Sequence, residues 1–342
     1  MRYELPRSQD RAIWDIWLSM HHLPAMAAAD ELGVFQALEE GAATAEETAQ
    51  RLGLNRRATG VLFSMLAALG LTDLHGERHE LADVTRTYLL RQSPYYWGPL
   101  LRSLGVLQQQ RAALIRALRA ADDVVSVVPT HLPSRGWSRG TVDRAQAEWV
   151  SRIMHCHSLP ASVAVARSGK LEGIEQLLDV GGGSGCFSIA IAQHFPGIRC
   201  AVMDLDAVCD VARGYIEEGG VSDRVGTLQV DMFHQDWPRG YDGIFLSNVF
   251  HDWNAETNLF LARRAYDALP SGGRIFLHEM LLADDGPGPL TTASFSMLLL
   301  FGTQGRQYSF GELRQILANA GFGNTEAHAT YGYYSLVVGR KP

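Results

Sequence analysis

The sequence predicts an α/β chain in which a mainly helical N-terminal part precedes a parallel sheet with helices on both faces. Residues 1 to about 110 carry apolar residues at helical spacing and few strand signals. After Gly169, short β-rich runs alternate with helical stretches, which is typical of a covered parallel sheet. We therefore expect domains at residues 1–105 and 169–342, joined by a helical connector at 106–168 that contributes to a substrate pocket.

Composition narrows the class of protein. The 342 residues include 30 basic and 37 acidic side chains, and the net charge of −7 disfavours nucleic acid or an anionic membrane as the main partner. The cysteines show no CxxC spacing, and we interpret them as buried free thiols; they are Cys156, Cys186, Cys200 and Cys209. The first residues carry no apolar signal segment, so we expect a cytoplasmic protein.

The helical part contains a helix-turn-helix pattern followed by a hairpin. Thr44 and Glu47 form a capping box that predicts a helix to about Leu52. Asn55 caps a second helix, which ends near Gly70. The hairpin strands are predicted at 71–74 and 78–81. Such a winged helix often binds DNA, but its second helix is apolar after two arginines, so we favour a core or subunit interface and keep a winged-helix regulator as the alternative.

The α/β part contains six runs with strand character. We predict five parallel strands and one closing antiparallel strand, at Gln176–Val180, Cys200–Asp204, Thr227–Asp231, Gly243–Ser247, Arg274–Glu279 and Tyr331–Val338.

A glycine-rich loop follows the first of these strands. A dinucleotide fingerprint, G-x-G-x-x-G, counted from Gly181 requires a sixth-position glycine where the chain has Cys186. The chain instead has glycine at 181, 183 and 185, preceded by Asp179. A carboxylate beside the loop repels pyrophosphate but can hold an ammonium group. The loop therefore favours the amino-acid end of S-adenosylmethionine, and an NAD-type oxidoreductase is the lesser alternative.

Two further acids end the next two predicted strands. Asp204 lies where a ribose-bearing cofactor needs an acceptor for its hydroxyls. Asp231 could accept from an adenine amino group while Met232 and Phe233 cover the ring. A single strand-end aspartate usually caps the following helix, but three on consecutive strands favour a cofactor site.

These motifs together resemble the two-domain S-adenosylmethionine-dependent O-methyltransferases, which include plant caffeate-type and acetylserotonin-type enzymes and bacterial natural-product methyltransferases. The matching stretches cover nearly the whole chain; besides the loop they are 203–205, 231–233, 250–253, 271–274 and 320–322. The resemblance implies a Rossmann-like class I methyltransferase domain after a winged-helix-like dimerisation domain. It also implies a homodimer formed through the N-terminal helices, and a small-molecule methyl acceptor from secondary metabolism.

The same resemblance assigns residues to the cofactor. Those that should touch S-adenosylmethionine are Asp179, Gly181, Gly183, Asp204, Leu205, Asp231, Met232, Phe233 and Ser247. Ser247 stands where plant members carry a lysine, and its hydroxyl can still serve the polar groups of the cofactor.

His251 is the candidate general base, followed by Asp252. A neutral hydroxyl is a poor nucleophile, and a histidine can remove its proton as the new bond forms. The alternative is that His251 caps the next helix or fills the pocket. The resemblance also implies that Glu279 orients this histidine, whereas Gln307 replaces a glutamate of the plant enzymes.

The Gln307 replacement keeps other acceptors open. S-methylation of a thioether, such as a methylthio-hydroxy acid, needs no base, and C-methylation of a keto acid is a further alternative. Some keto-acid C-methyltransferases hold a metal at the His-Asp pair; residues 291–305, which should face it, contain no histidine or acid, so we expect no metal. Predicted substrate-binding residues, which could equally be core, are Tyr95, Tyr96, Trp149, Arg152, His155, Met297 and Phe301.

Overall fold

A computed structural model describes residues 2–93, 96–98, 101, 108–120, 141–286 and 288–342. The chain divides into two compact units: a sheet unit, bounded as Met1–Asp10, Pro133–Met280 and Phe310–Pro342, and a helical unit, bounded as Arg11–Leu132 and Leu281–Ser309. The predicted connector is shared, since α8 (Gln108–Arg119) belongs to the helical unit and α11 (Arg144–Ala166) to the sheet unit. The predicted 169–342 domain also lends residues 281–309 to the helical unit.

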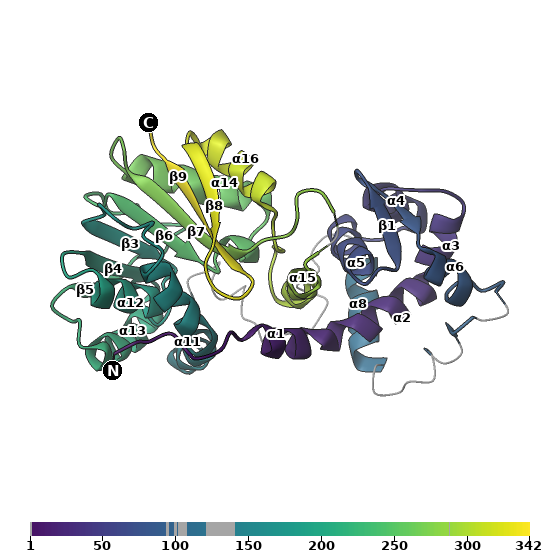
Figure 1. The fold of residues 1–342 in the computed structure, drawn as a ribbon, viewed down its shortest axis with the longest axis horizontal. Helices are drawn as coiled ribbons and strands as arrows, with labels where there is room; N and C mark the ends of the chain where they lie inside the picture. Colours follow the sequence, from purple (N-terminus) through teal and green to yellow (C-terminus); the bar gives the residue numbers. More distant parts are fainter. Residues whose placement is uncertain (1, 94–95, 99–100, 102–107, 121–140, 287) are drawn as a thin grey trace. The chain divides into compact units, whose positions relative to one another are not determined.

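The sheet unit is built on a seven-stranded sheet of order β5-β4-β3-β6-β7-β9-β8 (Figure 1). Its strands are β3 (Gln176–Val180), β4 (Arg199–Asp204), β5 (Val225–Gln229), β6 (Gly243–Ser247), β7 (Arg274–Met280), β8 (Gly323–Ala329) and β9 (Tyr334–Arg340). The first five are parallel, and β9 pairs antiparallel with both β7 and β8. This arrangement confirms the predicted α/β class.

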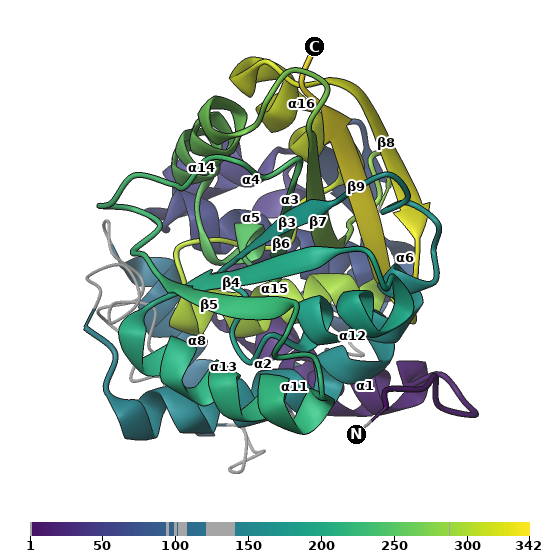
Figure 2. The same ribbon diagram turned by 90° about the vertical axis from the view of Figure 1, so that its left-hand side faces the viewer.

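Helices cover both faces of this sheet (Figure 2). One face carries α11, α12 (Cys186–His194) and α13 (Asp206–Gly219), and the other carries α14 (Ala255–Ala268) and α16 (Phe310–Ala320). The strand order reverses between β3 and β6. Ligands of open α/β sheets bind at such a reversal, outside the carboxyl ends of the strands. The strand order therefore predicts a ligand site beyond the carboxyl ends of β3 and β6.

Two strands, β5 and β9, differ from their predicted bounds by more than one residue, and a further strand, β8, was not predicted. β5 ends at Gln229, because the Asp231 carboxylate accepts the N–H of Phe233 at 2.8 Å and begins a turn there. β9 begins at Tyr334, since Gly332 has a φ of 58° in the preceding turn. β8 was not predicted: it is an edge strand with mostly exposed side chains, which leaves no apolar run in the sequence.

The helical unit contains the predicted capped helices and hairpin. Its elements are α1 (Arg11–Leu18), η1 (Ser19–His21), α2 (His22–Leu32), α3 (Val34–Glu39), α4 (Ala45–Leu52), α5 (Arg56–Ala68), β1 (Thr72–His75), β2 (Arg78–Leu81), α6 (Asp83–Tyr88), α8 and α15 (Leu290–Gly302). The capping box of Thr44 and Glu47 is confirmed, as is the Asn55 cap, which accepts the N–H of Ala58 at 2.9 Å. The apolar helix α15 packs against α5 in the core of this unit.

Two smaller sequence expectations concern membranes and cysteines. In the part of the chain that the structure describes, no helix combines the length and the apolar character needed to cross a membrane. The thiols of Cys186, Cys200 and Cys209 are buried and form no disulfide. The side chain of Cys156 lies outside the described residues.

Candidate functional site

The glycine loop between β3 and α12 has no room for a side chain at Gly182 but is open at the next residue, Gly183. Gly181, Gly183 and Gly185 have φ values of 65°, 57° and 74°, in the region that side chains disfavour. A Cβ on Gly182 would lie 2.8 Å from Cγ of Asp179, whereas a Cβ on Gly183 would meet nothing within 4 Å. The backbone at Gly183 therefore faces space that a ligand can enter.

Two buried carboxylates, those of Asp179 and Asp204, adjoin this loop. Oδ2 of Asp179 accepts the hydroxyl of Ser188 at 2.7 Å. Asp204 accepts the N–H groups of Gly183 at 3.0 Å and of Leu205 at 2.8 Å. Burial raises the pKa of Asp179 to about 7, helped by the charge of Asp204, and burial raises that of Asp204 to about 6. Both acids would gain from a bound cation or hydroxyl donor.

Asp231 lies beyond the end of β5 and is engaged in its own turn. Its carboxylate accepts the N–H of Phe233 and contacts Nδ1 of His234 at 2.8 Å. Burial opposes ionisation, but these hydrogen bonds outweigh it, so the pKa of Asp231 is lowered. The ring of Phe233 packs edge-on against Trp253, with centroids 4.7 Å apart. Asp231 thus acts as the local cap that strand-end aspartates often provide.

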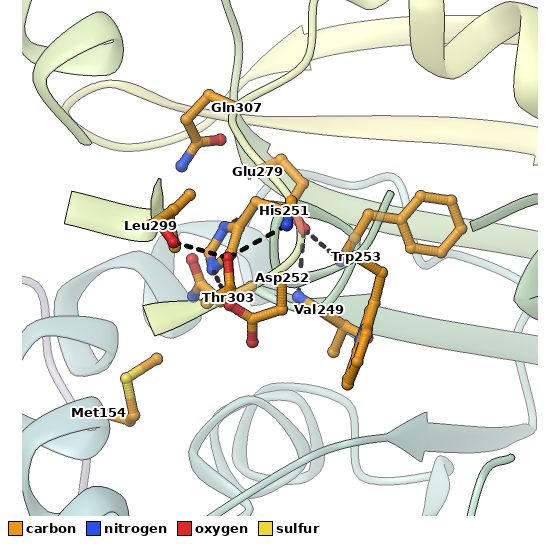
Figure 3. Close-up of polar contacts among 12 residues, drawn as sticks. Met154, Val249, His251, Asp252, Trp253, Glu279, Leu299, Thr303 and Gln307 are labelled. Carbon is orange, nitrogen blue, oxygen red and sulfur yellow. Dashed lines mark hydrogen bonds and ion pairs between the residues drawn. The ribbon is translucent and has the colours of Figure 1, made fainter. Parts of the chain in front are cut away.

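His251 and Glu279 form a buried pair at the carboxyl ends of β6 and β7 (Figure 3). Oε2 of Glu279 lies 2.7 Å from Nδ1 of His251. The other oxygen accepts the N–H groups of Val249 at 3.1 Å and Phe250 at 3.0 Å. An ionised carboxylate can only accept, so Nδ1 carries a proton. In the neutral ring Nε2 is then the nitrogen without a proton, which suits a general base.

Burial and the neighbouring charges act in opposite directions on the pKa of His251. Burial lowers the pKa of His251, but the charge and hydrogen bond of Glu279, with a smaller effect of Asp252, raise it above its ordinary value. Oδ1 of Asp252 lies 3.7 Å from Nε2, too far for a hydrogen bond. Removal from water raises the pKa of Asp252 to about 6, against the opposing effect of His251. His251 is therefore a base of raised strength.

Hydrogen bonds from α14 fix the turn that carries His251. The side-chain amide of Asn258 donates to the carbonyls of Phe250 at 2.8 Å and Trp253 at 3.2 Å. Sequence reasoning missed Asn258, because an asparagine on a helix face gives no signal without knowledge of the turn above it. The short helix η3 (Phe250–Asp252) is fixed in this way.

The predicted substrate residues of the sheet unit lie on α11. Trp149 and Arg152 are exposed. His155 is half-buried, with Nδ1 2.9 Å from the Ser184 hydroxyl of the glycine loop and its ring stacked on Tyr215 at 4.2 Å. The structure therefore brings His155 to the glycine loop.

The other predicted substrate residues belong to the helical unit or lie outside the description. Tyr96 donates its hydroxyl to the Asp30 carboxylate at 2.6 Å. Met297 lies in the apolar core of the helical unit, and Phe301 packs against that core. Tyr95 lies outside the described residues. Gln307 is buried in the helical unit, where its N–H donates to Ser296.

Metal-ligating side chains do not gather in the described ranges. No group of three or more His, Cys, Asp or Glu side chains there could hold a metal ion.

Comparison with known proteins gives the family. The O-methyltransferase domain family matches residues 133–323. A 3-hydroxy-5-methyl-1-naphthoate 3-O-methyltransferase of Streptomyces sahachiroi is 32% identical over 330 residues, which cover 96% of this chain and 94% of the relative. The crystal structure of an O-methyltransferase family 2 protein from Planctomyces limnophilus in complex with apigenin is 28% identical, covers all of both chains and has a TM-score of 0.87.

The same fold occurs in the human N-acetylserotonin methyltransferase in complex with SAM, at 22% identity, a TM-score of 0.60 and coverage of 98% and 99% of the two chains. The seven-stranded sheet with helices on both faces agrees with the family match. The chain belongs to the O-methyltransferase family and is an S-adenosylmethionine-dependent O-methyltransferase of small molecules.

Proposed function

We propose that His251 acts as the general base that removes a proton from the acceptor hydroxyl. The observation that carries this proposal is the 2.7 Å contact of Glu279 with Nδ1, which leaves Nε2 as the proton acceptor of the neutral ring. Glu279 positions the imidazole and stabilises the imidazolium that forms. Asp252, 3.7 Å from Nε2, adds negative charge on the same side. A positioned base of this kind contributes about 10²–10⁴ in rate.

The cofactor is proposed to lie along the ends of β3, β4, β5 and β6. When bound, S-adenosylmethionine supplies a methyl group activated by its sulfonium. The positive φ values of Gly181 and Gly183, the open backbone at Gly183 and the Asp179 carboxylate suit the methionine end. Asp204 and Leu205 suit the ribose. Asp231, Met232, Phe233 and Ser247 complete the proposed set of cofactor residues.

The raised pKa of Asp179 predicts pH-dependent cofactor binding. Only the ionised carboxylate attracts an ammonium group, and a pKa of about 7 leaves most of it protonated at pH 6. The dissociation constant of S-adenosylhomocysteine, whose ammonium stays charged in this range, should fall about tenfold from pH 6 to pH 8, with proton release on binding. Calorimetry in buffers of different ionisation enthalpy measures both effects.

The control for this prediction is Asp179→Asn. This variant should bind S-adenosylhomocysteine more weakly and with a much smaller pH dependence over the same range, since only Asp204, with its pKa of about 6, still titrates there. A flat dissociation constant in the wild-type protein would remove Asp179 from the ammonium site.

The methyl acceptor is proposed to be an aromatic hydroxyl. The Streptomyces relative is named for a 3-hydroxynaphthoate, and the buried base suits a hydroxyl that must lose a proton. The test is release of S-adenosylhomocysteine during incubation with phenols, hydroxy acids, keto acids and thioethers. Turnover of phenols supports the proposal, whereas turnover confined to thioethers or keto acids would support S- or C-methylation instead.

We also propose a homodimer formed through the N-terminal helices. A stripe of large apolar side chains is exposed on α1, η1 and α2 at helical spacing: Ile13 (68%), Ile16 (72%), Trp17 (42%), Met20 (43%) and Leu23 (44%). In the neighbouring helix-turn-helix, α5 buries eight of its 13 residues, which supports a core role rather than reading of DNA by a winged-helix regulator. The proposed setting is the cytoplasm.

The apolar stripe predicts a dimer-breaking substitution. Ile16→Asp puts a charge at the most exposed position of the stripe and should convert dimers to monomers at micromolar concentration, as measured by light scattering. Val84→Asp is the matched control, because Val84 is 48% exposed on α6, outside the stripe. A monomeric wild-type protein, or a dimer unaffected by Ile16→Asp, would contradict the proposed interface.

A further inference from the structure

A buried histidine outside the proposed base pair joins two of its elements. His278 lies on β7, next to Glu279, and is fully buried. Its Nδ1 is 3.1 Å from the Ser247 hydroxyl at the end of β6, and its Nε2 is 3.0 Å from the Thr330 hydroxyl. Its ring stacks flat on Tyr334, with centroids 4.8 Å apart and planes within 7°. The imidazole is therefore held in one orientation by contacts on both nitrogens and on its face.

The contacts of His278 determine where its proton lies. The Thr330 hydroxyl donates its one proton to the carbonyl of Tyr334 at 3.1 Å, so it must accept from Nε2–H of His278. Burial lowers the pKa of His278 to about 3, which keeps the ring neutral. Nδ1 then has no proton and accepts from the Ser247 hydroxyl.

This proton arrangement limits what Ser247 can offer a ligand. Its hydroxyl proton is used by His278, and the side-chain amide of Asn248 donates to the same oxygen at 3.3 Å. Ser247 is half-buried, so its oxygen can reach a ligand. A hydroxyl that already donates can interact with a further group only as an acceptor. It therefore suits an N–H or O–H donor and not a carboxylate.

Strand β7, which carries His278, also fixes the turn that leads to His251. The carbonyl of His278 accepts the N–H of Asn248 at 3.1 Å, and Asn248 has a φ of 55°, unusual for a residue with a side chain. The next two N–H groups bond to Glu279. β7 thus holds residues 248–250 one after another.

The turn also borders the glycine loop. The side chain of Val249 lies where a Cβ on Gly181 would come within 3.0 Å. The paired register of β3 with β6 reaches Asp179↔Phe245, two residues before Gly181 and Ser247. The strand that ends at Ser247 therefore lies beside the strand that leads into the part of the loop assigned to the methionine end of the cofactor.

We propose that His278 is a positioning residue that orients Ser247 as a hydrogen-bond acceptor for the ammonium group of the cofactor. The proposal rests on the proposed cofactor site and deepens it. Where a lysine at this position could offer only a donor, the Ser247–His278 pair offers an acceptor, which adds to the negative charge of Asp179 in recognising the ammonium.

A matched pair of variants tests the two nitrogens separately. His278→Asn keeps an acceptor near the position of Nδ1, and His278→Gln keeps a donor near that of Nε2. We expect His278→Asn to bind S-adenosylhomocysteine within about threefold of wild type and His278→Gln to bind about tenfold more weakly, the effect of losing one hydrogen bond to a charged group. Equal losses in both variants would mean that His278 only fills the core.

A deaminated analogue of S-adenosylhomocysteine, with hydrogen in place of the amino group, isolates the ammonium because it offers Ser247 no donor. With this analogue, His278→Gln should weaken binding less than threefold relative to the wild-type protein. Ser247→Ala should reproduce the tenfold loss, and the double variant should lose no more than Ser247→Ala alone. The proposal would be overturned if His278→Gln weakened the binding of both ligands equally. It would also be overturned if the double variant lost the sum of the two single losses in affinity.

A spectroscopic measurement separates this proposal from the proposed function. In the protein without cofactor, ¹⁵N shifts of labelled histidine should show His278 neutral, protonated at Nε2 and unchanged from pH 8 to pH 5. Protonation at Nδ1, or titration in that range, would overturn the role of His278. If the tautomer is as expected but the wild type does not bind S-adenosylhomocysteine, the proposed cofactor site fails instead.

Discussion

Replacing His251 with alanine is expected to lower kcat on a phenolic acceptor by about 10²–10⁴ at saturating S-adenosylmethionine. The substitution removes Nε2, the nitrogen that takes the hydroxyl proton, while the affinity for the cofactor should stay within about threefold because the proposed cofactor residues are untouched. The rate of S-adenosylhomocysteine formation, measured with the cofactor and the acceptor both in excess, gives the effect on kcat.

The pH dependence of this variant identifies the missing role. A phenol ionises by itself near pH 10, so the variant should recover part of its rate as the pH rises toward that value. The wild-type rate should instead level off once His251 is deprotonated, at a pH above 6.5 because Glu279 raises its pKa against the effect of burial. A histidine that only fills space would give no such recovery.

His75→Ala is a suitable control, since His75 is exposed on the hairpin strand β1 and should leave kcat unchanged. If His251→Ala keeps more than a third of the wild-type rate on a phenol, the base proposal fails. An unchanged rate on a thioether would support S-methylation, in which sulfur needs no deprotonation.

The parts of the fold that the sequence predicts are those with a local signal. β3 and β6 were predicted at their observed bounds, because buried parallel strands are short apolar runs bounded by turns. The Thr44 capping box lies within four residues and needs no tertiary information. β8, by contrast, owes its position to pairing with β9, and its exposed side chains leave no pattern to detect.

The candidate site shows the same division. The glycine loop is contiguous, so the open backbone at Gly183 could be predicted from the local sequence. The pairing of His251 with Glu279 could be named only from resemblance, because the two are 28 residues apart and meet through the register of β6 with β7. His278 faces Ser247 through that same register, and nothing in its neighbourhood along the chain indicates this contact.

The second large effect is expected for Glu279→Gln, which preserves shape and removes charge. The amide oxygen can still accept the N–H groups of Val249 and Phe250, so the turn should survive. The amide nitrogen then faces Nδ1 of His251 as a donor, which requires Nδ1 to give up its proton and places the proton on Nε2. A ring protonated at Nε2 cannot accept the hydroxyl proton.

We therefore expect Glu279→Gln to lower kcat by up to about 10⁴, the size of effect that a wrong histidine tautomer has in the serine protease triad. The loss of the carboxylate also leaves burial as the main influence on His251, so its pKa should fall below 6.5. Histidine ¹⁵N shifts report the tautomer and the pKa, and calorimetry should show unchanged cofactor affinity.

Glu256→Gln, at an exposed position in the first turn of α14, is the matched control and should retain full activity. A tenfold loss or less in Glu279→Gln, with Nδ1 still protonated, would show that the tautomer is set by another group. A large loss of kcat together with protonation of His251 at Nε2 would show that the rate depends on Glu279 keeping the proton of His251 on Nδ1.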